Sequence, residues 1–403
     1  MLHQASKRMF STGNSTVIVG AKRTPIGSFM GSISNLTAPH IGTVAAAGAL
    51  TSCNVNPEEV EECFMGAVLQ AGMGQAPARQ VALGAKCSFD TPSTTINKVC
   101  ASGMKAVMMA SQSIELGHRN VMLAGGMECM SKSPHYTSLR KATPYGEAKI
   151  LDSIKFDGLT DAYNQILMGS CVEKTCSEMD ISREAQDEYA IESYNRARAA
   201  QENGIFDWET VEITQQDRKG ERVFARDEEC QKFMPDKFPG LKPAFAKNGS
   251  ITAANASKIN DGAACMVLMS EQAAKDRGLK PLARIRAYDD AAVQPIDFAV
   301  APSSAVNKLL QRVGMNMSDI EYHEVNEAFS AVALANMKLL DLDPSRVNVH
   351  GGAVALGHPI GCSGARILIS LMNVLRTKDA TMGMASICNG GGGASAIILE
   401  RME

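Results

Sequence analysis

The sequence lacks the features that mark cysteine-rich and membrane proteins. Its eleven cysteines are irregularly spaced, with no CxxC pair and no Cys/His metal spacing, so they predict neither a disulfide framework nor a metal centre. An odd number of scattered cysteines favours reduced thiols in an intracellular compartment, most of them small buried hydrophobic residues. The apolar runs are too short, or too rich in small residues, to predict a membrane-spanning helix.

The sequence also lacks a strong charge of either sign. Its net charge of −3 argues against a broad nucleic-acid surface, but it is compatible with a local basic pocket for a phosphorylated ligand. The chain has 403 residues, of which 45% are hydrophobic. This length and composition predict a globular protein of two or three domains, with a core large enough to need no covalent cross-links.

The first 14 residues differ in composition from the rest. They contain Lys7 and Arg8, several Ser and Thr, and no acidic residue. This composition is typical of a mitochondrial transit peptide, and an irregular N-terminal tail is the alternative. The expected location is therefore the mitochondrial matrix.

Apolar strand patterns alternate with helical patterns along most of the chain. The segments "STTINKVC" and "NVMLAGGMECM" predict strands, whereas "APHIGTVAAAGALTS" and "SGMKAVMMASQSIELG" predict helices. This alternation favours an α/β fold with a mainly parallel sheet. Residues 131–250 are more polar, include the helical "SREAQDEYAIESYNRARAAQENG", and are interpreted as a large insertion that carries ligand contacts.

A weak internal repeat relates residues 99–126 to residues 361–391. Each copy has a small-residue start, an apolar helix, a polar turn, and an apolar strand that ends in Gly-Gly. The pattern predicts two related α/β halves that join near residue 282. The first turns of the equivalent helices in the two halves would then meet near a pseudo-twofold centre. The loops that precede these helices would face each other there and form a candidate functional site.

Two stretches at predicted helix starts carry candidate catalytic residues. Cys100 in "NKVCASG" precedes a helix, whose dipole and free N–H groups would lower the pKa of its thiol, while the small residues 101–103 leave room for an acyl group. An ordinary buried cysteine is the alternative. His358 lies between glycine and proline in a loop before a helix, a position that suits a catalytic imidazole, although a surface or satisfied core histidine fits as well.

Two further stretches add a second thiol and an amide. Cys388 ends an apolar strand and precedes four glycines, whose N–H groups can approach a ligand and donate to an oxyanion, or which simply form a turn. Asn326 in "HEVNEAF" either holds a water or a substrate oxygen, or caps the helix that follows. Together, the two thiols, the imidazole and the amide suit acyl transfer through a thioester, followed by carbon–carbon chemistry.

These motifs, in their order and spacing, resemble those of the thiolases, and among them the short-chain mitochondrial members. The resemblance covers residues 15–403 and rests on "NKVCASG", "VNEAF", "GGAVALGHPIGCSGAR" and "CNGGGG", supported by "PIGSF" and "TAANASKINDGAA". It implies a duplicated, five-layered α/β/α/β/α fold. The N-terminal half would span residues 15–281, including residues 131–250 as a coenzyme A-binding loop insertion, and the C-terminal half residues 282–403.

The resemblance also implies a reaction: the reversible condensation of two acetyl-CoA molecules to acetoacetyl-CoA and CoA, with thiolysis as its reverse. Cys100 would carry the acetyl group, and His358 would accept its thiol proton. Cys388 would move the proton on carbon. Asn326 would hold a water that, with His358, stabilises the enolate, and the N–H groups of Cys100 and Gly390 would stabilise the tetrahedral oxyanion.

Ligand contacts are implied in and beyond the insertion. The coenzyme A contacts would be Ser257 for the pantetheine arm and, for the adenine and phosphates, the residues Tyr194, Lys232, Phe233, Met234 and Lys237, whose lysines are alternatively ordinary solvated charges. Potassium would bind near Tyr194, Ala253, Ala254, Ala256 and Val354. CoA is expected as a substrate or product, with no tightly bound cofactor. The expected partners are acyl-CoA molecules and further copies of the chain in a homotetramer, not nucleic acid or a membrane.

Two positions depart from the family pattern. Leu167 stands where short-chain thiolases usually carry histidine, which bears on chain length, and Ala299 stands where members acting on branched substrates tend to have proline, which bears on 2-methylacetoacetyl-CoA. The alternatives are a 3-ketoacyl-CoA thiolase for longer chains and a non-catalytic acyl-CoA-binding relative. A decarboxylating ketoacyl synthase is disfavoured, because a second histidine would normally stand in place of Cys388.

Overall fold

The computed structural model describes residues 14–140, 143, 145–217 and 220–402. The predicted transit peptide therefore lies almost wholly outside the described residues. All eleven cysteines are free thiols, and nine of them are buried. None of the described helices is long and apolar enough to cross a membrane.

The helices and strands alternate along the chain as the sequence predicts. The strands of the main sheet are β1 (Thr16–Arg23), β2 (Gly27–Ser28), β3 (Glu62–Gly66), β4 (Ser93–Ile96), β5 (Val121–Cys129), β10 (Asn260–Ser270), β11 (Ala283–Ala292), β12 (Tyr322–Val325), β13 (Met382–Asn389) and β14 (Gly393–Arg401). The α-helices are α2 (Ala38–Ser52), α3 (Pro77–Gly84), α4 (Ser102–Glu115), α5 (Met168–Glu178), α6 (Arg183–Glu202), α7 (Glu271–Asp276), α8 (Ala301–Val313), α9 (Ser330–Leu340), α10 (Ala353–Leu356) and α11 (Ile360–Thr377).

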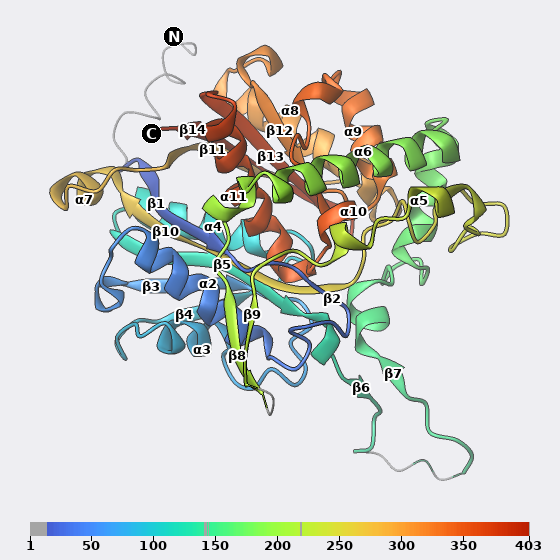
Figure 1. Ribbon diagram of the computed structural model, residues 1–403, viewed down its shortest axis with the longest axis horizontal. Helices are drawn as coiled ribbons and strands as arrows, with labels where there is room; N and C mark the ends of the chain where they lie inside the picture. The colour runs from blue at the N-terminus through green and yellow to red at the C-terminus, as the bar shows by residue number, and fades with distance from the viewer. Residues whose placement is uncertain (1–13, 141–142, 144, 218–219, 403) are drawn as a thin grey trace.

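Short elements connect these. Two small hairpins are formed by β6 (His135–Tyr136) with β7 (Leu151–Asp152), and by β8 (Ile213–Asp217) with β9 (Gly220–Phe224). The short helical turns are η1 (Pro57–Glu59), η2 (Met130–Lys132), η3 (Ile154–Gly158), η4 (Ile205–Trp208), η5 (Glu229–Lys232), η6 (Pro235–Gly240), η7 (Pro295–Val300), η8 (Met317–Asp319) and η9 (Pro344–Arg346). The hairpin of β6 and β7 lies away from the main sheet (Figure 1).

The main sheet consists of two half-sheets that meet at one edge. In the described part of the chain its order is β12-β13-β14-β11-β1-β10-β5-β3-β4, with β2 also paired to β10. The halves meet where β1 pairs with β11, through Val17 opposite Arg284 and Ile18 opposite Ala283. Only β3–β4, β3–β5 and β12–β13 are parallel pairs. The prediction of a mainly parallel sheet is therefore wrong, because β10, β11 and β14 run antiparallel to their neighbours.

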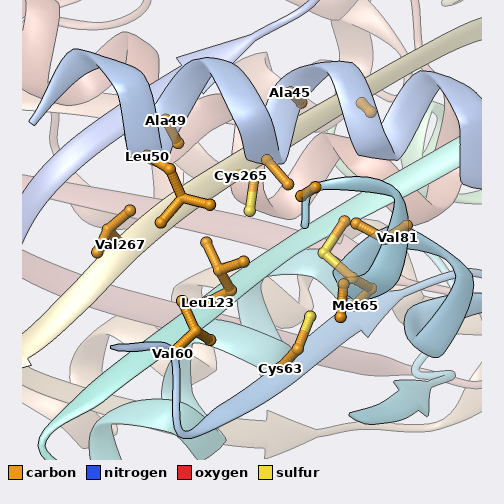
Figure 2. Close-up of a cluster of buried hydrophobic side chains, with 14 of the residues drawn as sticks. Ala45, Ala49, Leu50, Val60, Cys63, Met65, Val81, Leu123, Cys265 and Val267 are labelled. Carbon is orange, nitrogen blue, oxygen red and sulfur yellow. The ribbon is translucent and has the colours of Figure 1, made fainter. Parts of the chain in front are cut away.

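Side-chain alternation divides the core into three hydrophobic layers. Along β10, Cys265 and Val267 face α2 and α3 on one outer side, whereas Met266 and Leu268 face the central helices α4 and α11. The strands of the second half do the same, since β14 alternates between the central layer and the outer layer of α8 and α9. Figure 2 shows the first outer layer, where α2 packs over β5 and β10. With the sheets between them, these layers form the predicted five-layered α/β/α/β/α arrangement.

The two repeat copies meet in the central layer, where α4 and α11 cross at close range. A Cβ on Gly103 would lie 2.9 Å from the backbone nitrogen of Ala365, and one on Gly364 would lie 2.5 Å from that of Met104. Gly103 is therefore needed for helix packing, whereas the prediction that residues 101–103 leave room for an acyl group stays a prediction. Gly126 has a similar role: it lies inside β5, not at its end, and a Cβ there would lie 2.1 Å from the Gly361 carbonyl oxygen.

Candidate active site

A cavity of about 360 Å³ opens where the N-terminal ends of α4 and α11 meet the insertion. Its polar lining includes Cys100, Ser257, Lys258, His358 and Gly390. Most of the remaining wall is apolar, formed by side chains that include Met130, Ile154, Leu159, Leu167, Met168, Phe245, Phe298, Phe329 and Ile360. The structure thus brings together residues that are almost 300 positions apart in the sequence, in an environment from which water is largely excluded.

Cys100 lies in a tight turn between β4 and α4. The preceding residue, Val99, has φ of 48°, a conformation that is unfavourable for a β-branched side chain. Two hydrogen bonds hold the turn, because the Ser102 hydroxyl accepts from the Lys98 N–H at 2.8 Å and donates to the Val99 carbonyl at 2.5 Å. A strained backbone fixed in this way presents the sulfur of Cys100 at the cavity wall.

The helix start does not lower the pKa of Cys100. Burial raises the pKa of this thiol to about 12, although the Gly390 N–H donates to the sulfur and acts in the opposite direction. The predicted fall is therefore wrong for the free protein, because desolvation of the thiolate exceeds the effect of nearby N–H groups. Cys100 rests as a neutral thiol and needs a base in order to react.

The four glycines form the β13–β14 turn and also border the cavity. Gly391 and Gly392 have φ of 84° and 81°, which glycine adopts without strain. Gly390 lines the cavity with its N–H directed at the Cys100 sulfur. The turn interpretation is therefore confirmed, and the run also places one N–H donor at the Cys100 sulfur, whereas donation to an oxyanion stays a prediction.

His358 presents one ring nitrogen to the cavity and uses the other internally. Its Nδ1 lies 2.6 Å from the Ser363 hydroxyl, which donates its own proton to the Pro359 carbonyl at 3.0 Å. We assign the ring proton to Nδ1, because the hydroxyl then accepts from Nδ1–H while it donates to the Pro359 carbonyl, and in this tautomer Nε2 carries a lone pair. Nε2 is buried and has no hydrogen-bond partner, as expected of a base that waits for a substrate.

The loop that holds His358 is itself clamped. Its backbone N–H donates to the Asn260 side chain at 3.0 Å and lies 3.2 Å from the Lys258 carbonyl. Burial, together with the nearby positive charge of Arg366, lowers the pKa of the imidazole to about 3. The ring is therefore neutral near pH 7, which is the protonation state that a general base requires.

Cys388 lies near the end of β13 and is fully buried. Burial raises the pKa of its thiol above the usual range, and the charge of a Cys100 thiolate would raise it further. This interaction shows that the two sulfur atoms are within electrostatic reach of each other. Cys388 therefore also rests as a neutral thiol, behind the wall formed by Met168, Ala256 and Ala328.

Asn326 follows β12 and does not cap a helix. The next helix, α9, begins four residues later at Ser330 with Phe329 at its N-cap position, so the capping alternative is wrong. Both polar atoms of the Asn326 amide are buried without a hydrogen-bond partner. Because buried polar groups are nearly always paired, such an amide indicates a bound water or ligand atom.

Two buried carboxylates support these loops, and the sequence reasoning missed both. Glu327 accepts from the Tyr189 hydroxyl at 2.9 Å, the Ser193 hydroxyl at 2.8 Å, the Asn348 amide at 3.0 Å and the Val354 N–H at 3.0 Å. It thereby joins the Asn326 segment to α6 and α10. An acidic residue inside an apolar stretch, as in "VNEAF", was the available signal.

Glu128, in "GGMEC", links the two halves at the same place. Its carboxylate accepts from the N–H groups of Val68 and Gly361, both at 3.0 Å, and burial raises its pKa to about 7. It therefore joins a loop of the N-terminal half to the first turn of α11, close to Cys100.

The residues predicted to contact coenzyme A fall into two groups. Ser257 lines the cavity, and its hydroxyl donates to the Ala328 carbonyl at 2.7 Å. The others lie outside the cavity lining, along η5, η6 and the face of α6: Tyr194 and Phe233 stack with ring centroids 4.8 Å apart, Lys232 bonds the Ser28 hydroxyl, and Met234 and Lys237 are exposed.

The residues predicted to bind potassium surround a lysine instead. Lys258 Nζ lies 3.0 Å from the carbonyl oxygens of Ala256 and Val354, 3.4 Å from that of Ala254, and 5.0 Å from the ring centroid of Tyr194. The remaining residue of the set, Ala253, is exposed. The donor set thus already holds a cation, so these residues do not fit a potassium ion. The available signal in the sequence was the lysine of "NASK".

Comparison with known proteins gives consistent results over nearly the whole chain. Residues 16–272 match the thiolase N-terminal domain and residues 279–401 match the thiolase C-terminal domain. The mitochondrial acetyl-CoA acetyltransferases of Bos taurus and Rattus norvegicus are each 55% identical over 393 residues, which is 97% of this chain and 92% of theirs.

Solved structures agree with the fold. A thiolase from Ascaris suum, crystallised in complex with coenzyme A, superposes with a TM-score of 0.92 at 44% identity, covering 96% of this chain and 100% of its own. The acetyl-CoA acetyltransferase of Bacillus anthracis superposes with a TM-score of 0.94 at 41% identity, covering 96% of this chain and 99% of its own.

Proposed function

The chain belongs to the thiolase family, and on that premise we propose that it is an acetyl-CoA C-acetyltransferase that works through an acetyl-Cys100 intermediate. The observation that carries this proposal is the convergence of a half-buried thiol, an unpaired imidazole nitrogen and a directed N–H donor on one apolar cavity. Such a site can form a thioester from a thioester, an exchange that needs a thiol nucleophile and a base rather than a large driving force.

The first step is acylation of Cys100. Its sulfur attacks the thioester carbonyl carbon of acetyl-CoA while His358 Nε2 accepts the thiol proton. The carbonyl oxygen becomes negative and receives hydrogen bonds from the N–H groups of Gly390 and Cys100. Collapse of this intermediate breaks the carbon–sulfur bond to CoA, and the proton on His358 passes to the departing CoA thiolate. The result is acetyl-Cys100 and neutral CoA.

The second step joins two carbon atoms. Cys388 removes a proton from the methyl group of a second acetyl-CoA, and the resulting enolate attacks the carbonyl of acetyl-Cys100. Asn326 holds a water that donates to the enolate oxygen, and its unpaired buried amide supports this role. His358 adds a second donor only while Nε2 carries a proton, which the resting ring lacks. Collapse releases acetoacetyl-CoA and leaves Cys100 as a thiolate, which recovers a proton from Cys388.

The resting protonation states suit the reverse reaction, thiolysis. With acetoacetyl-CoA bound, neutral His358 can accept the proton of Cys100, and the neutral thiol of Cys388 can protonate the departing acetyl-CoA enolate. Condensation instead needs a Cys388 thiolate, so the Cys388 thiol must first lose its proton against the raised pKa that burial gives it. Both directions therefore use the same groups.

We further propose how the substrate binds and where the protein acts. Ser257, inside the cavity, contacts the pantetheine arm, while Tyr194, Lys232, Phe233, Met234 and Lys237 hold the adenine and phosphates. The protein is mitochondrial, as the names of the relatives support, and it acts in the matrix after removal of residues 1–14. Each chain consists of two halves that join near residue 282, and four chains assemble into a homotetramer.

One substrate comparison tests the function. Purified protein is incubated with CoA and either acetoacetyl-CoA or a ten-carbon 3-ketoacyl-CoA, and loss of the 3-ketothioester is followed. We expect faster turnover of acetoacetyl-CoA. Faster turnover of the long chain would instead identify a 3-ketoacyl-CoA thiolase, and Leu167 on the cavity wall would then mark its altered pocket. No turnover of either would refute the enzymatic assignment.

A variant separates the two thiols. Cys388→Ser should still form acetyl-enzyme from labelled acetyl-CoA, because Cys100 and His358 are intact, but it should lose condensation. The loss should be about a hundredfold or more, the usual range for a general acid or base. Condensation at the wild-type rate would show that another group moves the proton on carbon.

A further inference from the structure

A buried ammonium group sits where backbone carbonyl oxygens converge beside the active-site cavity. Lys258 Nζ is within 3.0 Å of the Ala256 and Val354 carbonyl oxygens and 3.4 Å from that of Ala254. The face of the Tyr194 ring closes one side, with its centroid 5.0 Å from Nζ. The three hydrogens of an ammonium match three carbonyl acceptors, so the charge is held by neutral oxygen atoms and a ring face.

No carboxylate forms a salt bridge with Lys258 among the described residues. Burial lowers the pKa of Lys258 to about 8, and Glu229 and Glu327 act in the opposite direction only through space. Both carboxylates are engaged elsewhere: Glu229 with Lys232 at 3.5 Å, and Glu327 with its four donors. The arrangement therefore differs from an ordinary buried ion pair. A cage of neutral carbonyl oxygens is the kind of donor set that binds a hard monovalent cation.

The cage joins the two segments that position the substrate and the base. Ala254 and Ala256 belong to the loop that carries Ser257, whereas Val354 belongs to α10, which leads directly to His358. The backbone of Lys258 also takes part, because its carbonyl accepts from the His358 N–H at 3.2 Å. The lysine thus fixes the His358 loop through both its side chain and its main chain.

We propose that the Lys258 ammonium is a built-in replacement for a bound monovalent cation, and that it makes the position of His358 independent of potassium. A free ion cannot enter the cage while the ammonium occupies it, because the same oxygens would have to serve two adjacent positive charges. Lys258 acts through His358 and Ser257, so it is a positioning residue and does not touch the reacting atoms.

The wild-type protein gives the first test. Its melting temperature and its kcat/KM for acetoacetyl-CoA thiolysis are compared in KCl and NaCl at equal ionic strength, with LiCl as a third arm. We expect the same values in all three salts. A melting temperature or rate that rises specifically in KCl would show that a potassium site exists and would overturn the proposal.

A matched set of variants gives the second test. Lys258→Ala empties the cage, so we expect a lower melting temperature and about a tenfold or greater loss of kcat/KM in NaCl. KCl should restore a large part of both, because potassium can now bind the carbonyl oxygens. Lys258→Met removes the charge but keeps the cage filled, so KCl should not restore it. Lys338→Ala is the control, since that ammonium donates to the Met179 carbonyl on the surface and should confer no potassium response.

The outcomes separate this inference from the proposed reaction on which its kinetic readout rests. The melting temperature reports cation binding whether or not acetoacetyl-CoA is the substrate. A folded Lys258→Ala protein that gains nothing from KCl would overturn the proposal, as would an equal response in Lys338→Ala. If Lys258→Ala does not fold, the wild-type comparison still tests the proposal, and refolding of the variant is tried in KCl and in NaCl. Folding that is restored only in KCl would support the proposal, and no restoration would contradict it.

Discussion

The hydrogen bond between Ser363 and His358 offers a direct test of how the base is prepared. Ser363→Ala removes the acceptor that lies 2.6 Å from Nδ1. The buried ring N–H then either stays unpaired or moves to Nε2, where it blocks the lone pair that faces the cavity. The substitution should therefore slow proton removal from Cys100 without changing any group that touches the substrate.

The size of the effect follows from the energy of an unpaired buried donor. Leaving such a group without a partner costs about 1–3 kcal/mol, and each 1.4 kcal/mol is about a factor of ten in rate or equilibrium. We therefore expect acylation of Cys100 to slow by about 5- to 150-fold. If the ring N–H stays unpaired, stability should fall by the same cost of about 1–3 kcal/mol, offset by up to about 0.5 kcal/mol because alanine is the better helix former in the first turn of α11.

The assay is single-turnover formation of acetyl-enzyme from labelled acetyl-CoA, followed by quenching and mass measurement of the Cys100 peptide. The control is Ser370→Ala, since Ser370 is a buried serine on the same helix whose hydroxyl contacts Arg366 at 3.4 Å and not His358. It should acylate at the wild-type rate. Acylation within twofold of wild type in a folded Ser363→Ala protein would refute the assignment of the ring proton to Nδ1.

Two further predictions concern Cys100 and its support. The pKa of about 12 leaves the Cys100 thiol protonated below that value. Alkylation of Cys100 by iodoacetamide in the free enzyme should therefore rise about tenfold per pH unit through pH 9. A plateau near pH 8.5 would contradict the raised pKa. Gly103→Ala should cost about 1–3 kcal/mol in unfolding free energy and reduce activity, because the added Cβ would meet the backbone of Ala365 and Gly361. The control is Gly240→Ala, whose added Cβ would face open space. An equal loss of stability in this control would contradict the packing argument.

Local motifs were sufficient to predict that Cys100, His358 and Gly390 meet in the cavity, but Lys258 was missed, and the predicted Cys388 and Asn326 do not line it. A thiol before a helix, a histidine between glycine and proline, and glycines after a strand each place a polar group at the end of an element. The duplication then predicts that such ends converge. The structure confirms the five-layered fold, and it brings Cys100, His358 and Gly390 into one cavity as expected.

Properties that depend on the full surroundings could not be read from these motifs. The pKa of Cys100 is a balance between desolvation and N–H donors, and desolvation depends on packing by distant segments. Gly103 must be small because α11 packs against it, which no local pattern reveals. The strand directions were misjudged for a related reason: alternation predicts α/β layers, but the pairing partners of β10 and β11 are set by the whole chain.

The resting charge state constrains how the chemistry begins. Burial keeps Cys100, Cys388 and His358 uncharged in the free enzyme, so attack by Cys100 must proceed together with proton transfer to Nε2. The negative charge then appears on the substrate oxygen, which we propose binds the Gly390 N–H that is directed at the Cys100 sulfur in the free enzyme. Fixed donors contribute most to a rate when the charge they stabilise exists only in the transition state. If Cys100 were permanently ionised, the Gly390 N–H would already stabilise its thiolate before any substrate bound. That hydrogen bond would then stabilise the ground state and contribute less to the rate.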